Sequence, residues 1–165
     1  MLNKKKVALL GAMAAAAMAS TGAQAATQTA TAEVDIVAAV QLAINDNLDF
    51  GIIASGGAPA AVQLLAADGT RTCGAGLTCA GSPRRGRFTV SGATANYVVA
   101  INVPSTTVLS AGGGSNMTLT LAPSMTSFTS SGGPQEFFVG GSLAVGANQP
   151  AGAYNGTYDV TADYQ

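Results

Sequence analysis

Residues 151–164, with the sequence AGAYNGTYDVTADY, decide the fold class of this chain. In this stretch, a first set of aromatic, aliphatic and small residues alternates with a second set of polar residues. The first set is Tyr154, Gly156, Tyr158, Val160, Ala162 and Tyr164, and the second set is Asn155, Thr157, Asp159, Thr161 and Asp163. Successive side chains of a β-strand point to opposite faces, so this pattern predicts an antiparallel strand with one buried and one solvated face.

The rest of the chain after residue 25 follows the same kind of pattern. Short alternating segments are separated by loops rich in Gly, Ser and Pro, and no stretch shows a convincing helical period. The further predicted strands are 61–66, 87–91, 97–103, 117–121, 137–145 and 157–164. Short strands spaced by turn signals predict a single all-β domain over residues 26–165, either a sandwich or a barrel. The aromatic residues expected in its core are Phe50, Phe88, Tyr97, Phe137 or Phe138, Tyr154, Tyr158 and Tyr164.

The first 25 residues predict a secretory signal peptide. Lys4, Lys5 and Lys6 form a positive region, residues 7–19 form an apolar run, and residues 23–25 form an A-x-A cleavage box. The apolar run is shorter than the roughly 20 residues that a membrane-spanning helix needs. We therefore expect an exported chain, located in the periplasm, at the cell surface or outside the cell. We expect no integral membrane segment after cleavage.

The charge of the chain after residue 25 limits its partners. Four arginines remain there against eight acidic residues, so the net charge is −4, with no lysine, histidine or tryptophan. Proteins that bind nucleic acid or anionic lipid use positive charge to neutralise phosphate groups. The sequence therefore argues against both kinds of partner.

Candidate catalytic groups are scarce. Without histidine, a Ser-His-Asp or Cys-His arrangement is impossible. No residue pattern predicts a metal site or a cofactor site. We therefore expect a protein that is not an enzyme and that uses no cofactor. A hydrolase built on carboxylates is the least favoured alternative, with Asp49 and Asp159 as its first candidates.

Cys73 and Cys79 are the only cysteines, in the sequence CGAGLTC. In an exported chain, two cysteines this close predict a disulfide that closes a short loop. A redox pair usually has two intervening residues, and a zinc site would need further ligands that the chain lacks. A structural disulfide is the favoured interpretation.

Arg84, Arg85 and Arg87 form the only basic cluster after residue 25. They are a candidate ligand patch for an acidic partner, a polysaccharide phosphate or a carboxylate. The favoured alternative is a set of solvated charges that protects the following strand from edge-to-edge aggregation.

Residues 30–44 form the longest alternation, with Ala30, Ala32, Val34 and Ile36 at the start of its apolar face. Strands are most often about 5–6 residues long and rarely exceed about 10. The stretch is therefore either an N-terminal arm, residues 26–35, followed by a strand, or one long strand that bends between two sheets. The pattern alone favours the single bent strand.

Three motifs occur together in the chain. They are Leu48-Asp49-Phe50-Gly51, then GRFTVSG at residues 86–92 leading to Tyr97 and Val103-Pro104, and then AGAYNGTYDV at residues 151–160. This combination resembles DUF4402, a family of exported bacterial proteins, across almost the whole chain after residue 25. That family is similar in pattern to spore coat protein U-like subunits of chaperone–usher pili.

The resemblance implies an immunoglobulin-like antiparallel β-sandwich of about seven to eight strands. Pilin subunits lack one strand of this fold, and the N-terminal arm of a neighbouring subunit fills the gap. Residues 26–35 would then be the arm, with Ala30, Ala32, Val34 and Ile36 as the side chains that fill pockets. The implied partners are further copies or other pilin-like subunits, together with a periplasmic chaperone and an usher.

Two function classes fit these sequence features. The first is a structural pilin-like or cell-surface subunit that assembles by β-strand complementation. The second is a self-contained periplasmic or extracellular module that binds a glycan or another surface ligand, with Arg84, Arg85 and Arg87 as its site. Removal of the arm separates them, because only the first class needs it.

Overall fold

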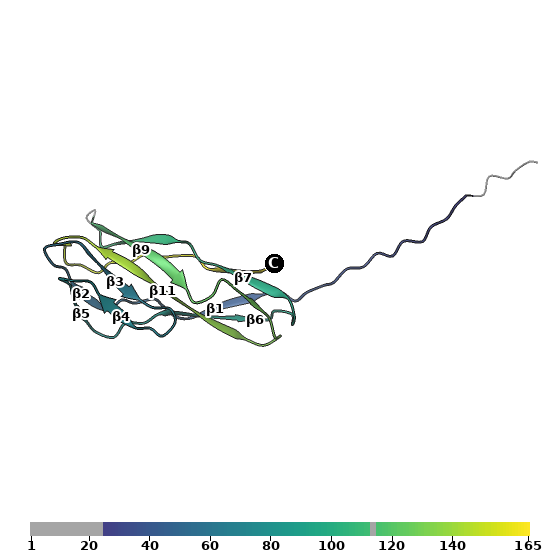
Figure 1. Cartoon of the computed structure of the whole chain (residues 1–165), viewed down its shortest axis with the longest axis horizontal. Helices are drawn as coiled ribbons and strands as arrows, with labels where there is room; N and C mark the ends of the chain where they lie inside the picture. Colours follow the sequence, from purple (N-terminus) through teal and green to yellow (C-terminus); the bar gives the residue numbers. More distant parts are fainter. Residues whose placement is uncertain (1–24, 113–114) are drawn as a thin grey trace, which may run out of the picture. The chain divides into compact units, whose positions relative to one another are not determined.

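The computed structural model describes residues 25–112 and 115–165 (Figure 1). The predicted signal peptide lies outside these ranges, apart from Ala25. Within them, every regular element is a β-strand, every strand pair is antiparallel, and no helix has the length and apolar character needed to cross a membrane. The chain divides into two units after Val34. The all-β prediction is therefore confirmed for the described residues.

The strands of the described residues form three sheets. The seven-stranded sheet contains β1 (Gln41–Asp46), β3 (Ala60–Leu64), β4 (Arg71–Cys73), β6 (Gly86–Ser91), β8 (Thr106–Ser110), β9 (Asn116–Pro123) and β11 (Gln135–Val145). The three-stranded sheet contains β7 (Val98–Asn102), β10 (Ser127–Thr129) and β12 (Thr161–Tyr164). The two-stranded sheet contains β2 (Ile52–Ala54) and β5 (Thr78–Ala80).

The expected number of strands, about seven to eight, is wrong for the described residues, which contain twelve. Four of the additional strands, β2, β4, β5 and β10, have three residues each. So short a segment shows no alternation that a sequence pattern could reveal. The fifth, β8, has apolar residues on both faces, because Leu109 packs against the core while Val108 is exposed.

Strand β11 organises the large sheet. Residues 135–139 pair with β6, residues 139–143 pair with β9, and residues 141–145 pair with β3. Gly140 and Gly141 lie where these partners converge, and a Cβ atom on either would collide with backbone atoms of neighbouring residues. Glycine at both positions therefore allows neighbouring backbone segments to approach β11 closely.

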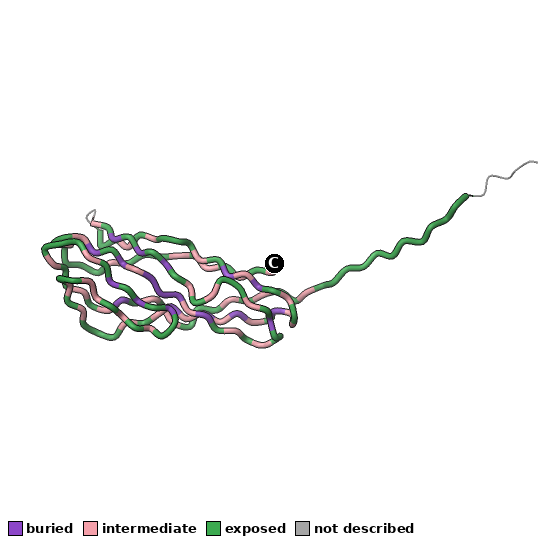
Figure 2. The backbone as a smooth tube through the Cα atoms, viewed as in Figure 1, coloured by how far each residue is buried: buried purple, intermediate pink, exposed green. Residues whose placement is uncertain are grey.

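The core lies between the seven-stranded and the three-stranded sheets. Val99 and Ile101 of β7 belong to the same buried cluster as Phe88 and Val90 of β6 and Phe137 of β11. The rings of Phe88 and Phe137 stack with their centroids 5.2 Å apart. Figure 2 shows buried residues alternating with more exposed ones along these strands, as expected for sheets with one apolar face.

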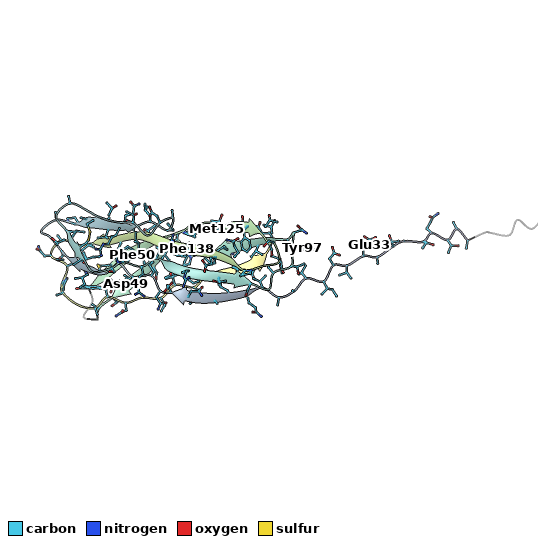
Figure 3. The ribbon with its side chains drawn as sticks, turned by 90° about the horizontal axis from the view of Figure 1, so that it is seen from below. Glu33, Asp49, Phe50, Tyr97, Met125 and Phe138 are labelled. Carbon is cyan, nitrogen blue, oxygen red and sulfur yellow. A yellow bond between two sulfur atoms is a disulfide. The ribbon has the colours of Figure 1, made fainter. Side chains whose placement is uncertain are left out.

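The long N-terminal alternation does not form one strand. Strand β1 begins at Gln41, whereas residues 25–36 are exposed and belong to no strand. The prediction of a single bent strand over residues 30–44 is therefore wrong. Figure 3 draws the side chains of the exposed segment, including Glu33. Alternation alone does not make a strand, because a strand also needs a hydrogen-bonded neighbour.

The C-terminal segment follows the predicted alternation of burial but only part of it is a strand. Tyr154, Tyr158, Val160, Ala162 and Tyr164 are half-buried, and the polar residues between them are exposed. Only residues 161–164 form a regular strand, β12, which pairs with β7. Residues 157–160, also predicted as strand, form no regular strand, although the carbonyl of Thr157 accepts a hydrogen bond from the hydroxyl of Thr107 at 2.7 Å.

Cys73 and Cys79 form the predicted disulfide, which connects β4 to β5. Replacing both cysteines by serine is expected to lower the free energy of unfolding by about 2 kcal/mol, because a loop this short restricts the unfolded chain only modestly. Urea denaturation of the oxidised protein and of the double variant measures the difference. A loss near zero would contradict a stabilising role for the disulfide.

Candidate functional site

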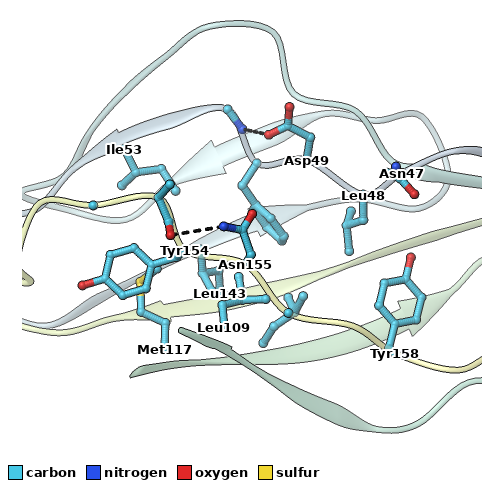
Figure 4. A pocket seen from close by; sticks show the side chains of 16 residues that line it. Asn47, Leu48, Asp49, Ile53, Leu109, Met117, Leu143, Tyr154, Asn155 and Tyr158 are labelled. Carbon is cyan, nitrogen blue, oxygen red and sulfur yellow. Dashed lines mark hydrogen bonds between the residues drawn. The ribbon is translucent and has the colours of Figure 1, made fainter. Parts of the chain in front are cut away.

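A groove opens the core of the domain to solvent. Two adjoining cavities of about 500 and 380 Å³ share Ile53, Met117, Gly152 and Tyr154 in their linings. We call the two together the core groove. Its further large apolar and aromatic lining residues are Leu48, Phe50, Leu109, Leu119, Leu143, Val145 and Tyr158. Figure 4 shows the larger of the two cavities, with Ile53, Leu109, Met117, Leu143 and Tyr154 among the side chains that line it.

The two walls of the core groove come from opposite ends of the domain sequence. Residues 47–55 form the first wall, which includes β2, and residues 149–158 form the second wall. The first wall is bonded on its outer side, through β5 and through a bridge between Asp49 and Arg84. The second wall is bonded to β8, where the backbones of Asn155 and Ser110 exchange bonds of 2.9 and 3.0 Å.

The walls meet at the ends of the groove and not along it. At one end, the backbone N–H of Asn148 donates to the carbonyl of Gly56 at 2.8 Å. Beyond the other end, the hydroxyl of Tyr164 donates to the carbonyl of Ala38 at 2.8 Å. These contacts show that the two segments run antiparallel. Among the described residues, no backbone hydrogen bond joins residues 47–54 to residues 150–160.

The apolar side chains on the two walls are only partly buried, as expected where no backbone hydrogen bonds join the walls in the described chain. Leu48 and Ile53 on the first wall, and Tyr154 and Tyr158 on the second, pack against the core but are only half-buried. The partial burial of Tyr158 raises the pKa of its hydroxyl. Apolar side chains of both walls therefore contact the core and remain in contact with solvent along the groove.

The motif Leu48-Asp49-Phe50-Gly51 builds part of the first wall. Leu48 and Phe50 contact the core, and the carboxylate of Asp49 accepts a hydrogen bond of 2.7 Å from the backbone N–H of Gly51. Gly51 has a φ of +75°, a backbone conformation that favours glycine. The motif therefore directs two apolar side chains into the groove while the backbone turns between them and β2.

The three arginines of the candidate ligand patch lie together. A cavity of about 410 Å³ is lined by Arg84, Arg85 and Arg87 with Phe138. Two of them have partners within the domain. Arg87 forms ion pairs with Asp46 at 2.7 Å and Glu136 at 3.4 Å.

Arg85 stacks on the ring of Phe138 at 3.5 Å and donates to the carbonyls of Ala66 and Ala67. These contacts assign structural roles to Arg85 and Arg87, while Arg84 is exposed. Asp68 lies at the same cavity, and hydrogen bonds from the backbone and side chain of Thr70 lower the pKa of its carboxyl group.

Asp49 and Asp159, the two candidate carboxylates for hydrolysis, lie in different environments. Asp49 lines the core groove, where its carboxylate bonds to Gly51, while Asp159 lies on the exposed face of the C-terminal segment. Across residues 25–112 and 115–165, no three His, Cys, Asp or Glu residues are grouped so that they could hold a metal ion.

Arg71 is a functional candidate in this region that the sequence patterns did not indicate. It is a single arginine in β4, outside the basic cluster, and its guanidinium donates to three backbone carbonyls beside the first wall. No local pattern could have identified it, because its acceptors lie at residues 50, 80 and 81.

The fold and the groove define an all-β antiparallel domain whose apolar core is open between two antiparallel backbone segments. The family model of DUF4402, described as a domain of unknown function, matches residues 40–164. The chain belongs to the DUF4402 family, which confirms the family predicted from the three motifs. A comparison with curated proteins finds no match.

Proposed function

We propose that this protein is an exported, non-enzymatic structural subunit that assembles with other subunits by β-strand complementation. In this proposal the core groove accepts an extended segment from another copy. The observation that carries the proposal is the pair of antiparallel walls, without backbone bonds between them in the described chain, above half-buried core side chains. An added strand would bond to both walls and cover the core.

The exposed N-terminal arm has the properties that such an added strand needs. Val34 and Ile36 are 83% and 91% exposed, and they lie in phase with Ala30 and Ala32. Burial of each of the two larger side chains in the groove would contribute about 1.5–3 kcal/mol. Each backbone hydrogen bond to a wall would add about 0.5–1.5 kcal/mol. Together these terms favour a stable contact between subunits.

The direction of the walls restricts the geometry of the added strand. Because the walls run antiparallel, a strand between them is parallel to one wall and antiparallel to the other. We propose that, with that strand, the domain becomes a closed immunoglobulin-like sandwich, the fold expected from the resemblance of its motifs to spore coat protein U-like subunits. A periplasmic chaperone and an usher are the proposed assembly partners, and the cell surface is the proposed destination.

Removal of the arm tests the proposal. The protein of residues 26–165 is expected to form polymers, and the protein of residues 37–165, which lacks the arm and Ile36, is expected to be a folded monomer. The shorter protein retains all buried core residues, which lie between Phe50 and Val145. Size-exclusion chromatography with light scattering and negative-stain microscopy measure the difference.

The other result would favour the second function class. A folded monomer in both forms would contradict strand exchange. It would support a self-contained module that binds a surface ligand, with the arginine cavity as its first candidate site.

A further inference from the structure

The first wall of the core groove has few backbone connections to the rest of the domain. Strand β2 pairs with β5, and these two strands form a separate two-stranded sheet. In the described chain, neither strand belongs to the ladder of the seven-stranded sheet. The position of this β2–β5 ribbon therefore depends strongly on side chains that reach it from neighbouring strands.

Two side chains of β4 reach the ribbon. Arg71 and Cys73 are two residues apart in an extended strand, so their side chains leave the same face. Cys73 is joined to Cys79 of β5 by the disulfide. Arg71 donates through Nη1 to the carbonyls of Phe50 and Ala80, at 2.7 and 2.9 Å, and through Nη2 to the carbonyl of Gly81, at 3.3 Å.

The arginine thereby holds both strands of the ribbon at once. Phe50 precedes β2 by two residues, and Ala80 is the last residue of β5 and pairs with Ile52. The next pair along the ribbon is Ile53 with Cys79, so the disulfide acts beside a residue that lines both cavities. Hydrogen bonds from a charged donor are stronger than neutral ones, and the planar guanidinium suits several fixed acceptors.

Gly51 leaves the space that this contact occupies. A Cβ atom at Gly51 would lie 2.6 Å from Nη1 of Arg71 and 2.8 Å from the carbonyl oxygen of Ala80. Any other residue here would displace the guanidinium as well as strain the backbone. Gly51, the last residue of the Leu48-Asp49-Phe50-Gly51 motif, therefore leaves room for the guanidinium of Arg71, which lies 20 positions later in the chain.

We propose that Arg71, with the Cys73–Cys79 disulfide beside it, is a positioning residue for strand acceptance. It holds Phe50 and Ile53 in the wall, so that the wall presents its backbone to an incoming strand. This inference rests on the proposed function of the core groove. It adds that the position of the first wall depends on Arg71, a side chain that does not line the groove.

A binding measurement tests this role. The protein of residues 37–165 is titrated into a fluorescently labelled peptide of residues 26–36, and the anisotropy of the label reports binding. Arg71→Gln is expected to weaken peptide binding by about tenfold or more, because charge-assisted bonds that order the wall are lost. Glu136→Gln is the control, and it is expected to change binding by less than about twofold, because Glu136 is an exposed charge that lines neither cavity of the core groove.

Hydrogen exchange separates a loose wall from a misfolded domain. In Arg71→Gln, faster exchange is expected at residues 50–54 and 78–81, with unchanged protection in β6 and β11. If this variant unfolds, Arg71→Lys replaces it, because lysine keeps the charge but lacks the planar fork. Weak binding by a folded Arg71→Lys protein supports the inference.

The outcomes distinguish the inference from the proposed function. If the wild-type domain fails to bind the peptide, the proposed function is wrong, and hydrogen exchange still shows whether Arg71 orders the ribbon. If the wild type binds and a folded Arg71 variant binds equally well, the positioning role is overturned while the proposed function stands.

Discussion

Replacement of Val34 and Ile36 by aspartate is expected to abolish assembly of the protein of residues 26–165. In the proposed complex these side chains enter an apolar groove lined by residues such as Met117, Leu119 and Leu143. A carboxylate placed there would lose its hydration without gaining a partner of opposite charge. Each substitution also removes the apolar contact, worth about 1.5–3 kcal/mol. Light scattering after size-exclusion chromatography is expected to report monomers only.

A second double variant controls for the added charge. Thr29→Asp with Thr31→Asp places the same two charges on the opposite face of the arm, which would face solvent in the complex. This variant is expected to assemble almost as the wild type does. Equal loss of assembly in both double variants would show that net charge, and not insertion of Val34 and Ile36, controls association.

Phe137→Ala is expected to cause a larger loss of stability than removal of the disulfide. The Phe137 side chain is fully buried and stacks on Phe88 at the centre of the core. Truncation of a buried phenylalanine costs about 3–5 kcal/mol, because burial is lost and a cavity remains. That is a large part of the roughly 5–15 kcal/mol that stabilises a typical domain. Urea denaturation followed by circular dichroism measures the change.

The neighbouring residue supplies a matched control. Phe138 is half-buried on the other face of β11, where Arg85 stacks on its ring at 3.5 Å. Phe138→Ala removes the same group and is expected to cost about 1 kcal/mol, the range of a partly exposed cation–π contact. Similar losses in the two variants would contradict the assignment of Phe137 to the core face.

Phe137 and Phe138 also show where prediction from sequence ends. The alternation placed one of the two in the core but did not select between them. The choice is made by the pairing of β11 with β6, in which Phe137 lies opposite Phe88. A shift of one residue in that register would exchange the two faces, so the selection depends on contacts between strands.

The disulfide and the strand patterns were predictable because both are local. Cys73 and Cys79 are close in the chain, and the half-buried set in residues 154–164 follows the period of an extended backbone. The order of the strands in the sheets was not predictable, since it joins segments far apart in the sequence.

An antiparallel all-β chain, one disulfide and membership of the DUF4402 family could all be predicted from the residue pattern. The core groove emerged only from the folded structure, because it lies where two distant segments, residues 47–55 and 149–158, approach each other without backbone–backbone hydrogen bonds between them in the described chain. The folded structure alone assigned Arg71 to the wall, since the three carbonyls that bind its guanidinium come from segments that meet only after folding. The alternation of apolar and polar residues depends on neighbours in the sequence, whereas the core groove depends on how distant segments pack in the folded domain.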